Sequence, residues 1–259
     1  MTLSVYISGQ RSFGAAIATL TASSGYHLTG IASPPATRDG QPDRLALTAE
    51  RLRIPWTDSG RLTPGSIPPG TDVILAAHSH AFIGARTRAR ATLAAIGYHP
   101  SLLPLHRGRD AVRWTARDGD RVAGGTVYHL TATVDGGPIA AQDYVIIPPG
   151  ITARDLWHDH LFPLGLHLTG RVLADLASGL VVCVPQDDAL ATWEPSWDRP
   201  PLHRPELPEL PSGRADVRYT ADPARLRRLA RPFSEHMEHR TPQEVPDAGT
   251  PPHGRANRD

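Results

Sequence analysis

Residues 72–77 read DVILAA, and the residues after Asp72 form a continuous apolar run. Such a run is typical of a strand that is buried on both faces. Two further β-type runs lie at residues 3–7 and 27–33, and segments with helical spacing follow them at 15–24 and 44–53. Strands that alternate with helices predict an α/β fold, with a mostly parallel sheet between flanking helices.

The next part of the chain has a different pattern. Residues 122–132 and 139–149 alternate in polarity, and the glycine-rich turn 134–138 joins them. This pattern predicts an antiparallel pair at the C-terminal end of the sheet. Residues 152–179 have apolar positions at helical spacing and predict one long helix, which Pro163 kinks or splits.

The composition narrows the class of protein. All 27 basic residues are arginine, which excludes Schiff-base chemistry on lysine and a P-loop lysine. The formal net charge is +1, so no strong overall field draws nucleic acid to the surface. Cys183 is the single cysteine, so no intrachain disulfide can form and a reducing compartment is expected. The first residues are too polar for a signal peptide and no apolar run reaches the ~18–20 residues of a membrane span, so we predict a cytoplasmic protein.

The stretch 97–108 reads GYHPSLLPLHRG and contains the candidate catalytic histidine. His99 ends a predicted strand and precedes Pro100, which stiffens the backbone there. Ligands of open parallel sheets bind at the carboxyl ends of strands, so this position favours a functional histidine. A structural histidine that bonds a backbone carbonyl fits the sequence equally well. Asp135, in the turn VDGGP, either closes a local turn or folds back to orient His99.

Several motifs together resemble the folate-dependent formyltransferase family. They are YHPSLLPLHRGRDAVRWT at 98–115, VDGGPI at 134–139, LFPLG at 161–165 and QDDALATWEPSWDRPP at 186–201. The family includes methionyl-tRNA, glycinamide ribonucleotide and sugar-amine formyltransferases and the formyltetrahydrofolate hydrolases. The resemblance implies a Rossmann-like formyltransferase fold for a catalytic domain over residues 1–205. Residues 206–259 are expected to form a proline- and arginine-rich extension, partly disordered, with one short helix at 221–233.

The resemblance also implies the ligands and the residues that bind them. 10-Formyltetrahydrofolate would be the one-carbon donor, with no metal, and His99 and Asp135 would be the catalytic pair. The folate would be bound by the segment after residues 72–77 and by the turn around Asp135, at Ala77, His78, Ser79, His80, Phe82, Val134, Gly136 and Gly137. The acceptor would contact Gly97, Arg107 and Gly108.

One position departs from the family. Most of its transferases have an asparagine two residues before the histidine, where this chain has Gly97. The loss of one such oxyanion donor typically costs about 3 kcal/mol in the transition state. His78, Ser79 and His80 are the nearest candidates to replace it.

Three functions remain open. We favour formyl transfer to a small-molecule amine, because no second catalytic domain is expected after residue 205. Hydrolysis of 10-formyltetrahydrofolate to formate is the alternative, because the active-site motif is closest to that of the hydrolase domain of 10-formyltetrahydrofolate dehydrogenase, which also lacks the asparagine. A folate-binding protein without activity is the third, and the intact His99 and Asp135 argue against it. A tRNA acceptor is not expected, because the C-terminal segment is short and rich in proline. The sequence identifies neither the acceptor nor the oligomeric state.

Overall fold

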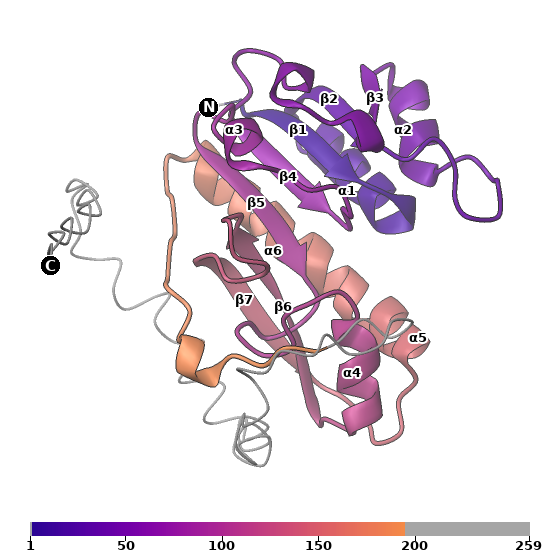
Figure 1. The fold of residues 1–259 in the computed structure, drawn as a ribbon, viewed down its shortest axis with the longest axis vertical. Coiled ribbons are helices and arrows are strands. Elements are labelled where there is room, and N and C mark those ends of the chain that lie inside the picture. The colour runs from indigo at the N-terminus through magenta and orange to yellow at the C-terminus, as the bar shows by residue number, and fades with distance from the viewer. Residues whose placement is uncertain (1, 195–259) are drawn as a thin grey trace, which may run out of the picture.

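The computed structural model describes residues 2–194. A seven-stranded sheet runs through them in the order β3-β2-β1-β4-β5-β6-β7 (Figure 1). The strands are β1 (Ser4–Gly9), β2 (His27–Ser33), β3 (Trp56–Asp58), β4 (Val73–Ala77), β5 (Ala94–His99), β6 (Val122–His129) and β7 (Ile139–Ile146). The first five strands pair in parallel, whereas β6 and β7 run antiparallel to their neighbours. The predicted fold class, including the C-terminal antiparallel pair, is confirmed.

The two faces of the sheet are covered unequally. The helices are α1 (Arg11–Ser23), α2 (Arg44–Leu52), α3 (Ala85–Arg88), α4 (Ala111–Asp118), α5 (Ala153–Asp155) and α6 (Phe162–Ala177). The larger core lies under α1 and α6, where Ile17 and Leu168 pack on the apolar side chains of β1 and β4. A smaller core on the other face joins Tyr6 and Ile74 to Ile67 and Ile83 from the connecting segments. Each fully buried side chain of this kind contributes about 1.5–3 kcal/mol to folding.

α1 begins at Arg11, earlier than the apolar spacing predicts. The backbone N–H of Arg11 donates to both carboxylate oxygens of Asp43, at 3.1 and 2.9 Å. Asp43 is buried and also caps α2 through the N–H of Leu45. This long-range contact fixes the first turn of α1. The apolar spacing of the sequence does not reveal the contact, so it predicts a later start of the helix.

The predicted long helix is a continuous element whose hydrogen bonding changes along its length. α5 leads into a π-helical turn at Leu156–Leu161, and α6 follows directly. Pro163 lies in the first turn of α6, next to this turn. Proline has no N–H to donate, so a change in hydrogen-bonding pattern just before it removes the conflict with an ideal α-helix.

Within residues 2–194, no helix is both long enough and apolar enough to cross a membrane. The predicted domain boundary at residue 205, the extension 206–259 and the helix at 221–233 lie outside the described residues.

Candidate active site

His99 is the last residue of β5, the strand that joins the parallel part of the sheet to the antiparallel pair. Its side chain is only 8% exposed. Nε2 lies 2.8 Å from the carbonyl oxygen of His106 and must donate to it, because a carbonyl oxygen only accepts. Nδ1 is then the ring atom that can gain or lose a proton, and it lies 3.7 Å from Oδ2 of Asp135. His99 thus bonds a backbone carbonyl with one nitrogen and faces Asp135 with the other.

The carboxylate of Asp135 is held by two other segments. The Tyr128 hydroxyl donates to Oδ1 at 2.7 Å, and the backbone N–H of Gly108 donates to Oδ2 at 2.8 Å. Burial and the neighbouring Asp135 charge raise the pKa of Tyr128 well above its ordinary value, so the phenol stays a neutral donor. Asp135 itself has a φ of 51°, a left-handed conformation that aspartate adopts more readily than most residues. The turn therefore presents a carboxylate of fixed orientation to His99.

A further set of hydrogen bonds ties this turn to the segment around Gln186. Gln186 Nε2 donates to the carbonyl oxygens of Asp135 and Gly137, at 2.8 and 2.7 Å. Gln186 Oε1 in turn accepts from Arg107 Nη2 at 2.7 Å, and the same nitrogen pairs with Asp188 at 2.6 Å. The predicted contact of Arg107 with the acceptor stays a prediction, and in this structure the guanidinium is buried and directed at these groups. Arg107 thereby supports the Asp135 turn.

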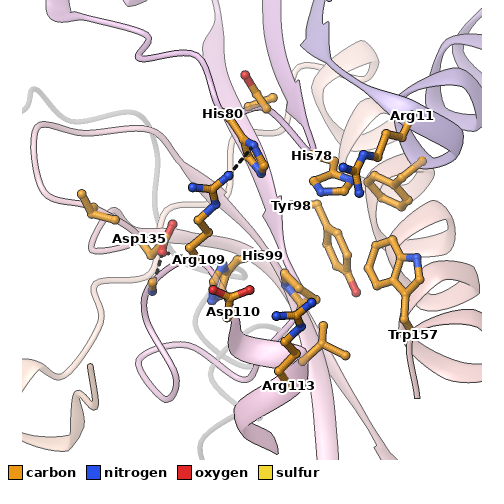
Figure 2. Close-up of a pocket in the computed structure, with 18 of the residues that line it drawn as sticks. Arg11, His78, His80, Tyr98, His99, Arg109, Asp110, Arg113, Asp135 and Trp157 are labelled. Carbon is orange, nitrogen blue, oxygen red and sulfur yellow. Dashed lines mark hydrogen bonds and ion pairs between the residues drawn. The ribbon is translucent and has the colours of Figure 1, made fainter. Parts of the chain in front are cut away.

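A cavity of about 870 Å³ opens beside His99, where the carboxyl ends of β1, β4 and β5 come together (Figure 2). Besides His99 and Asp135, the predicted residues that line it are His78, Ser79, His80, Gly97, Gly108 and Val134. His99, Asp135 and most of the predicted polar residues thus line one cavity.

Other predicted binding residues lie outside the cavity wall. Ala77 is fully buried within β4, and Phe82 is 81% exposed away from the wall. A Cβ at Gly136 would collide with Thr133, and one at Gly137 would collide with the carbonyl oxygen of His129. These two glycines therefore allow the close packing of the turn, and their predicted contact with the folate stays a prediction.

Gly97 is packed against the neighbouring strand. It pairs with Tyr128 of β6, and a Cβ on Gly97 would lie 3.5 Å from Tyr128 Cε1 and 3.1 Å from Leu130 Cδ2. Leu130 and Tyr128 would therefore crowd the Cβ of any side chain at position 97.

Sequence reasoning missed one whole wall of the cavity. It consists of Arg11 and Phe13 from the start of α1, Arg154 of α5, and Trp157 of the π-helical turn. Arg11 and Phe13 follow the carboxyl end of β1, so their position was a usable signal. Arg154 and Trp157 lie on a helical segment without a recognisable motif, and only the tertiary fold brings them to the site. Further lining residues that were missed include Arg109, Asp110, Arg113 and Tyr128.

The charge balance of the cavity is positive. Four arginines and two aspartates line it. Burial, the neighbouring His80 and the charges of Arg11 and Arg109 lower the pKa of His78 to about 4, so His78 is neutral at physiological pH. Burial and the charge of Arg109 also lower the pKa of His80, whose Nδ1 lies 3.1 Å from Arg109 Nη2.

One cluster within residues 2–194 has the composition of a metal site. His106, Asp118 and Glu194 have candidate ligand atoms within 4.8 Å of one another. Burial alone would lower the pKa of His106, but Asp120 and Glu194 raise it to about 9, and His106 Nε2 lies 2.9 Å from Asp120 Oδ2. A protonated imidazole has no lone pair for a metal. In this structure His106 forms ion pairs with Asp120 and Glu194 that anchor the loop whose carbonyl bonds His99.

The fold and the site together define a Rossmann-like α/β protein with a His–Asp pair at the carboxyl edge of its sheet. Residues 68–161 match the family model described as formyl transferase, and the predicted resemblance to this family is confirmed. Two solved structures share the fold. Glycinamide ribonucleotide transformylase 1 from Symbiobacterium toebii aligns with a TM-score of 0.58 and 20% identity over 71% of this chain and 94% of its own. The N-formyltransferase from Helicobacter canadensis, solved with folinic acid and dTDP-3-aminofucose, aligns with a TM-score of 0.63 and 13% identity over 77% of this chain and 73% of its own.

Relatives by sequence point to the same family. The mitochondrial 10-formyltetrahydrofolate dehydrogenase of Mus musculus is 30% identical over 217 residues, which cover 76% of this chain and 23% of the relative. The methionyl-tRNA formyltransferase of Lactobacillus delbrueckii subsp. bulgaricus is 27% identical over 74% of this chain and 64% of the relative. The chain thus spans about a quarter of the length of the dehydrogenases that it matches.

Proposed function

We propose that this chain transfers a formyl group from 10-formyltetrahydrofolate to a small-molecule amine, with His99 and Asp135 as the catalytic pair. The observation that carries the proposal is the orientation of His99. Its Nε2 is engaged with a carbonyl, and its Nδ1 faces both Asp135 and the cavity in a chain with a formyl transferase domain. The names of the relatives support the donor, because they include 10-formyltetrahydrofolate dehydrogenases.

The cavity fits a reduced folate and a small acceptor. Its volume of about 870 Å³ is within the range of small-molecule sites, roughly 300–1,000 Å³. The wall near Asp135 combines polar and charged side chains with the exposed, apolar Val134, which offers one apolar contact to a flat heterocycle. When bound, 10-formyltetrahydrofolate supplies the formyl group. The residues of this chain then have to move one proton and stabilise one developing charge.

His99 performs the proton transfer in this proposal. Nδ1 accepts the proton that the attacking amine loses and returns it to the folate nitrogen that leaves, so the proton balance closes within one turnover. Asp135 stabilises the imidazolium formed in between. The Nδ1–Oδ2 separation of 3.7 Å is longer than a hydrogen bond, and we expect it to shorten when ligands fill the site.

The missing asparagine requires another donor for the formyl oxygen. Among the candidates, Ser79 Oγ shares a hydrogen bond of 2.9 Å with Ser8 Oγ, and His80 Nδ1 accepts from Arg109, which leaves Nε2–H of His80 as a donor. His78 lines the cavity and is neutral at physiological pH, since its pKa is about 4. We therefore propose that one of the two neutral imidazoles on the cavity wall, His78 or His80, is the oxyanion donor.

Hydrolysis is the second candidate function. Gly97 and the likeness to 10-formyltetrahydrofolate dehydrogenases favour it. In this case His99 Nδ1 would accept a proton from water instead of an amine, and formate would be released.

One assay separates these functions. Purified chain is incubated with 10-formyltetrahydrofolate and no acceptor, and tetrahydrofolate and formate are followed together. We expect the folate to persist until an amine is added. Stoichiometric formate that disappears in His99→Ala would establish the hydrolase instead, and a chain that does not bind the folate would exclude both functions.

A further inference from the structure

The cavity has two walls that differ in chemistry (Figure 2). Asp135, Arg109 and His80 lie on one side of His99, and Arg11 and Trp157 lie on the other. We propose that the second wall, formed by Arg11, Phe13, Arg154 and Trp157, is the acceptor subsite, and that it selects an amine that carries a carboxylate or phosphate beside a flat or apolar body. This inference rests on the proposed function, because it names the acceptor class of that reaction. We call this surface the arginine–aromatic wall.

Aromatic side chains form the base of the arginine–aromatic wall. The Phe13 ring lies 5.2 Å from the Tyr98 ring and 5.5 Å from the Trp157 ring, measured between centroids. Phe13 and Tyr98 are buried, whereas Trp157 is half-buried, and all three line the cavity. Trp157 belongs to the π-helical turn, a distortion that occurs frequently at functional sites. A half-buried indole on a rigid base offers a flat apolar surface to a ligand.

An uncommon backbone conformation holds Arg11 at the cavity. Its φ is 57°, in the left-handed region, and Asp43 fixes this conformation by accepting the Arg11 N–H with both oxygens. Residues other than glycine, asparagine and aspartate seldom adopt this region, and such strain concentrates at functional sites. A long cationic side chain therefore occupies a position where glycine would fit with less strain.

The side chains of Arg11 and Arg154 are available for a ligand. Within residues 2–194, neither guanidinium has a hydrogen-bond or ion-pair partner, although both residues line the cavity. Arg107 shows the contrast, since its guanidinium is buried against Gln186 and Asp188. Guanidinium groups match the planar geometry of carboxylates and phosphates and bind them through paired hydrogen bonds.

The charges in the cavity favour an anion at this wall. Arg11 and Arg109 lie close enough to His78 for their charges to add to the lowering of its pKa by burial and by His80. The aspartates that line the cavity, Asp110 and Asp135, leave an excess of positive charge. An acceptor with an anionic group would offset this excess while its amine approaches His99.

A carboxylate on the folate itself is the other source of such an anion. A pair of matched probes separates the two sources. 4-(Aminomethyl)benzoate and 4-methylbenzylamine share the amine and the ring and differ in the carboxylate. 5-Formyltetrahydrofolate reports on the folate alone.

Dissociation constants of the three probes are measured by NMR titration of the full chain and of Arg11→Gln, Arg154→Gln and Trp157→Ala. Arg86→Gln is the matched control, because Arg86 is exposed on α3 and does not line the cavity. We expect 4-(aminomethyl)benzoate to bind at least about 10-fold more tightly than 4-methylbenzylamine. In each arginine variant, the dissociation constant of 4-(aminomethyl)benzoate should rise about 10-fold, and that of 5-formyltetrahydrofolate should change less than about two-fold. Trp157→Ala should weaken the binding of both amines, 4-(aminomethyl)benzoate and 4-methylbenzylamine.

Equal affinity of the two amines, or benzoate binding that is unchanged in both arginine variants, would overturn the inference. Weakened binding of 5-formyltetrahydrofolate with unchanged benzoate binding would also overturn it, since the arginines would then hold the folate. If the benzoate behaves as expected but the chain neither binds nor consumes the folates, the anion subsite stands and the proposed formyl transfer fails.

Discussion

The two walls of the cavity are supported in different ways. The wall with Asp135, Arg109 and His80 is called the catalytic wall here, after its proposed role. On it, Asp135 accepts hydrogen bonds from Tyr128 and Gly108 at its carboxylate and from Gln186 at its carbonyl. On the arginine–aromatic wall, the guanidinium groups of Arg11 and Arg154 have no such partner in the described part of the chain. A fixed orientation suits the wall where the reacting atoms have to align, and a free guanidinium suits the recognition of an acceptor. Substitutions behind the catalytic wall should therefore lower kcat, and those on the arginine–aromatic wall should raise the KM of the acceptor.

The largest effect is expected when the reacting group itself is removed. His99→Ala should lower turnover of 10-formyltetrahydrofolate by about 1,000-fold, because no other group accepts and returns the proton. Binding of 5-formyltetrahydrofolate should change little. His27→Ala, at an exposed position on β2, is the control. Turnover near the normal rate in His99→Ala would remove the catalytic assignment.

The support behind Asp135 should have the next largest effect. Tyr128→Phe removes the 2.7 Å hydrogen bond to the carboxylate and leaves the ring over Gly97 in place. A hydrogen bond to a charged group contributes about 1.5–3 kcal/mol, so we expect kcat to fall about 10- to 100-fold. KM values should change less than about two-fold, and an unchanged thermal unfolding midpoint separates this loss of kcat from a general loss of folding. Tyr26→Phe serves as the control, and an equal loss in both variants would argue against a positioning role of Tyr128.

The difference between the walls also shows what the sequence could and could not predict. The strand β4 was predicted from an apolar run, and the pair β6 and β7 from alternating polarity. Both predictions depend on local sequence pattern, and the structure has these strands. The approach of Asp135 to His99 was expected from the motifs. The orientation of the Arg107 side chain was not expected, because it depends on a hydrogen bond to Gln186, which is 79 residues away in sequence. Apolar spacing also could not reveal the π-helical turn that carries Trp157, because an α-helix and a π-helix present similar patterns over one turn.

The loop that holds His99 contains His106, whose ion pairs should make the stability of the protein depend on pH. The folded-state pKa of His106 is about 9, above its ordinary value of 6.5, so its ion pairs contribute fully below about pH 6.5. This contribution is lost as the pH rises through 9. We expect the wild-type free energy of unfolding, measured by urea unfolding, to fall by about 3 kcal/mol between pH 6.5 and pH 9.5 relative to that of His106→Gln. The exposed-site variant His27→Gln should keep the wild-type slope. Parallel curves for wild type and His106→Gln would contradict the raised pKa.

The smallest effect concerns the glycine that first marked the site as altered. Gly97→Asn restores the residue type that most transferases of the family have, and the backbone at this position needs no left-handed φ. The new Cβ would lie 3.1 Å from the flexible end of Leu130, so we expect a loss of about 1 kcal/mol in stability, measured by thermal unfolding. Because Leu130 and Tyr128 crowd the new Cβ, we expect the asparagine amide to be displaced from the formyl oxygen and formyl transfer to rise less than about three-fold. Gly97→Ala is the matched control for the Cβ alone. A large gain specific to asparagine would mean that Leu130 yields readily and that the catalytic wall is less rigid than its hydrogen bonds indicate.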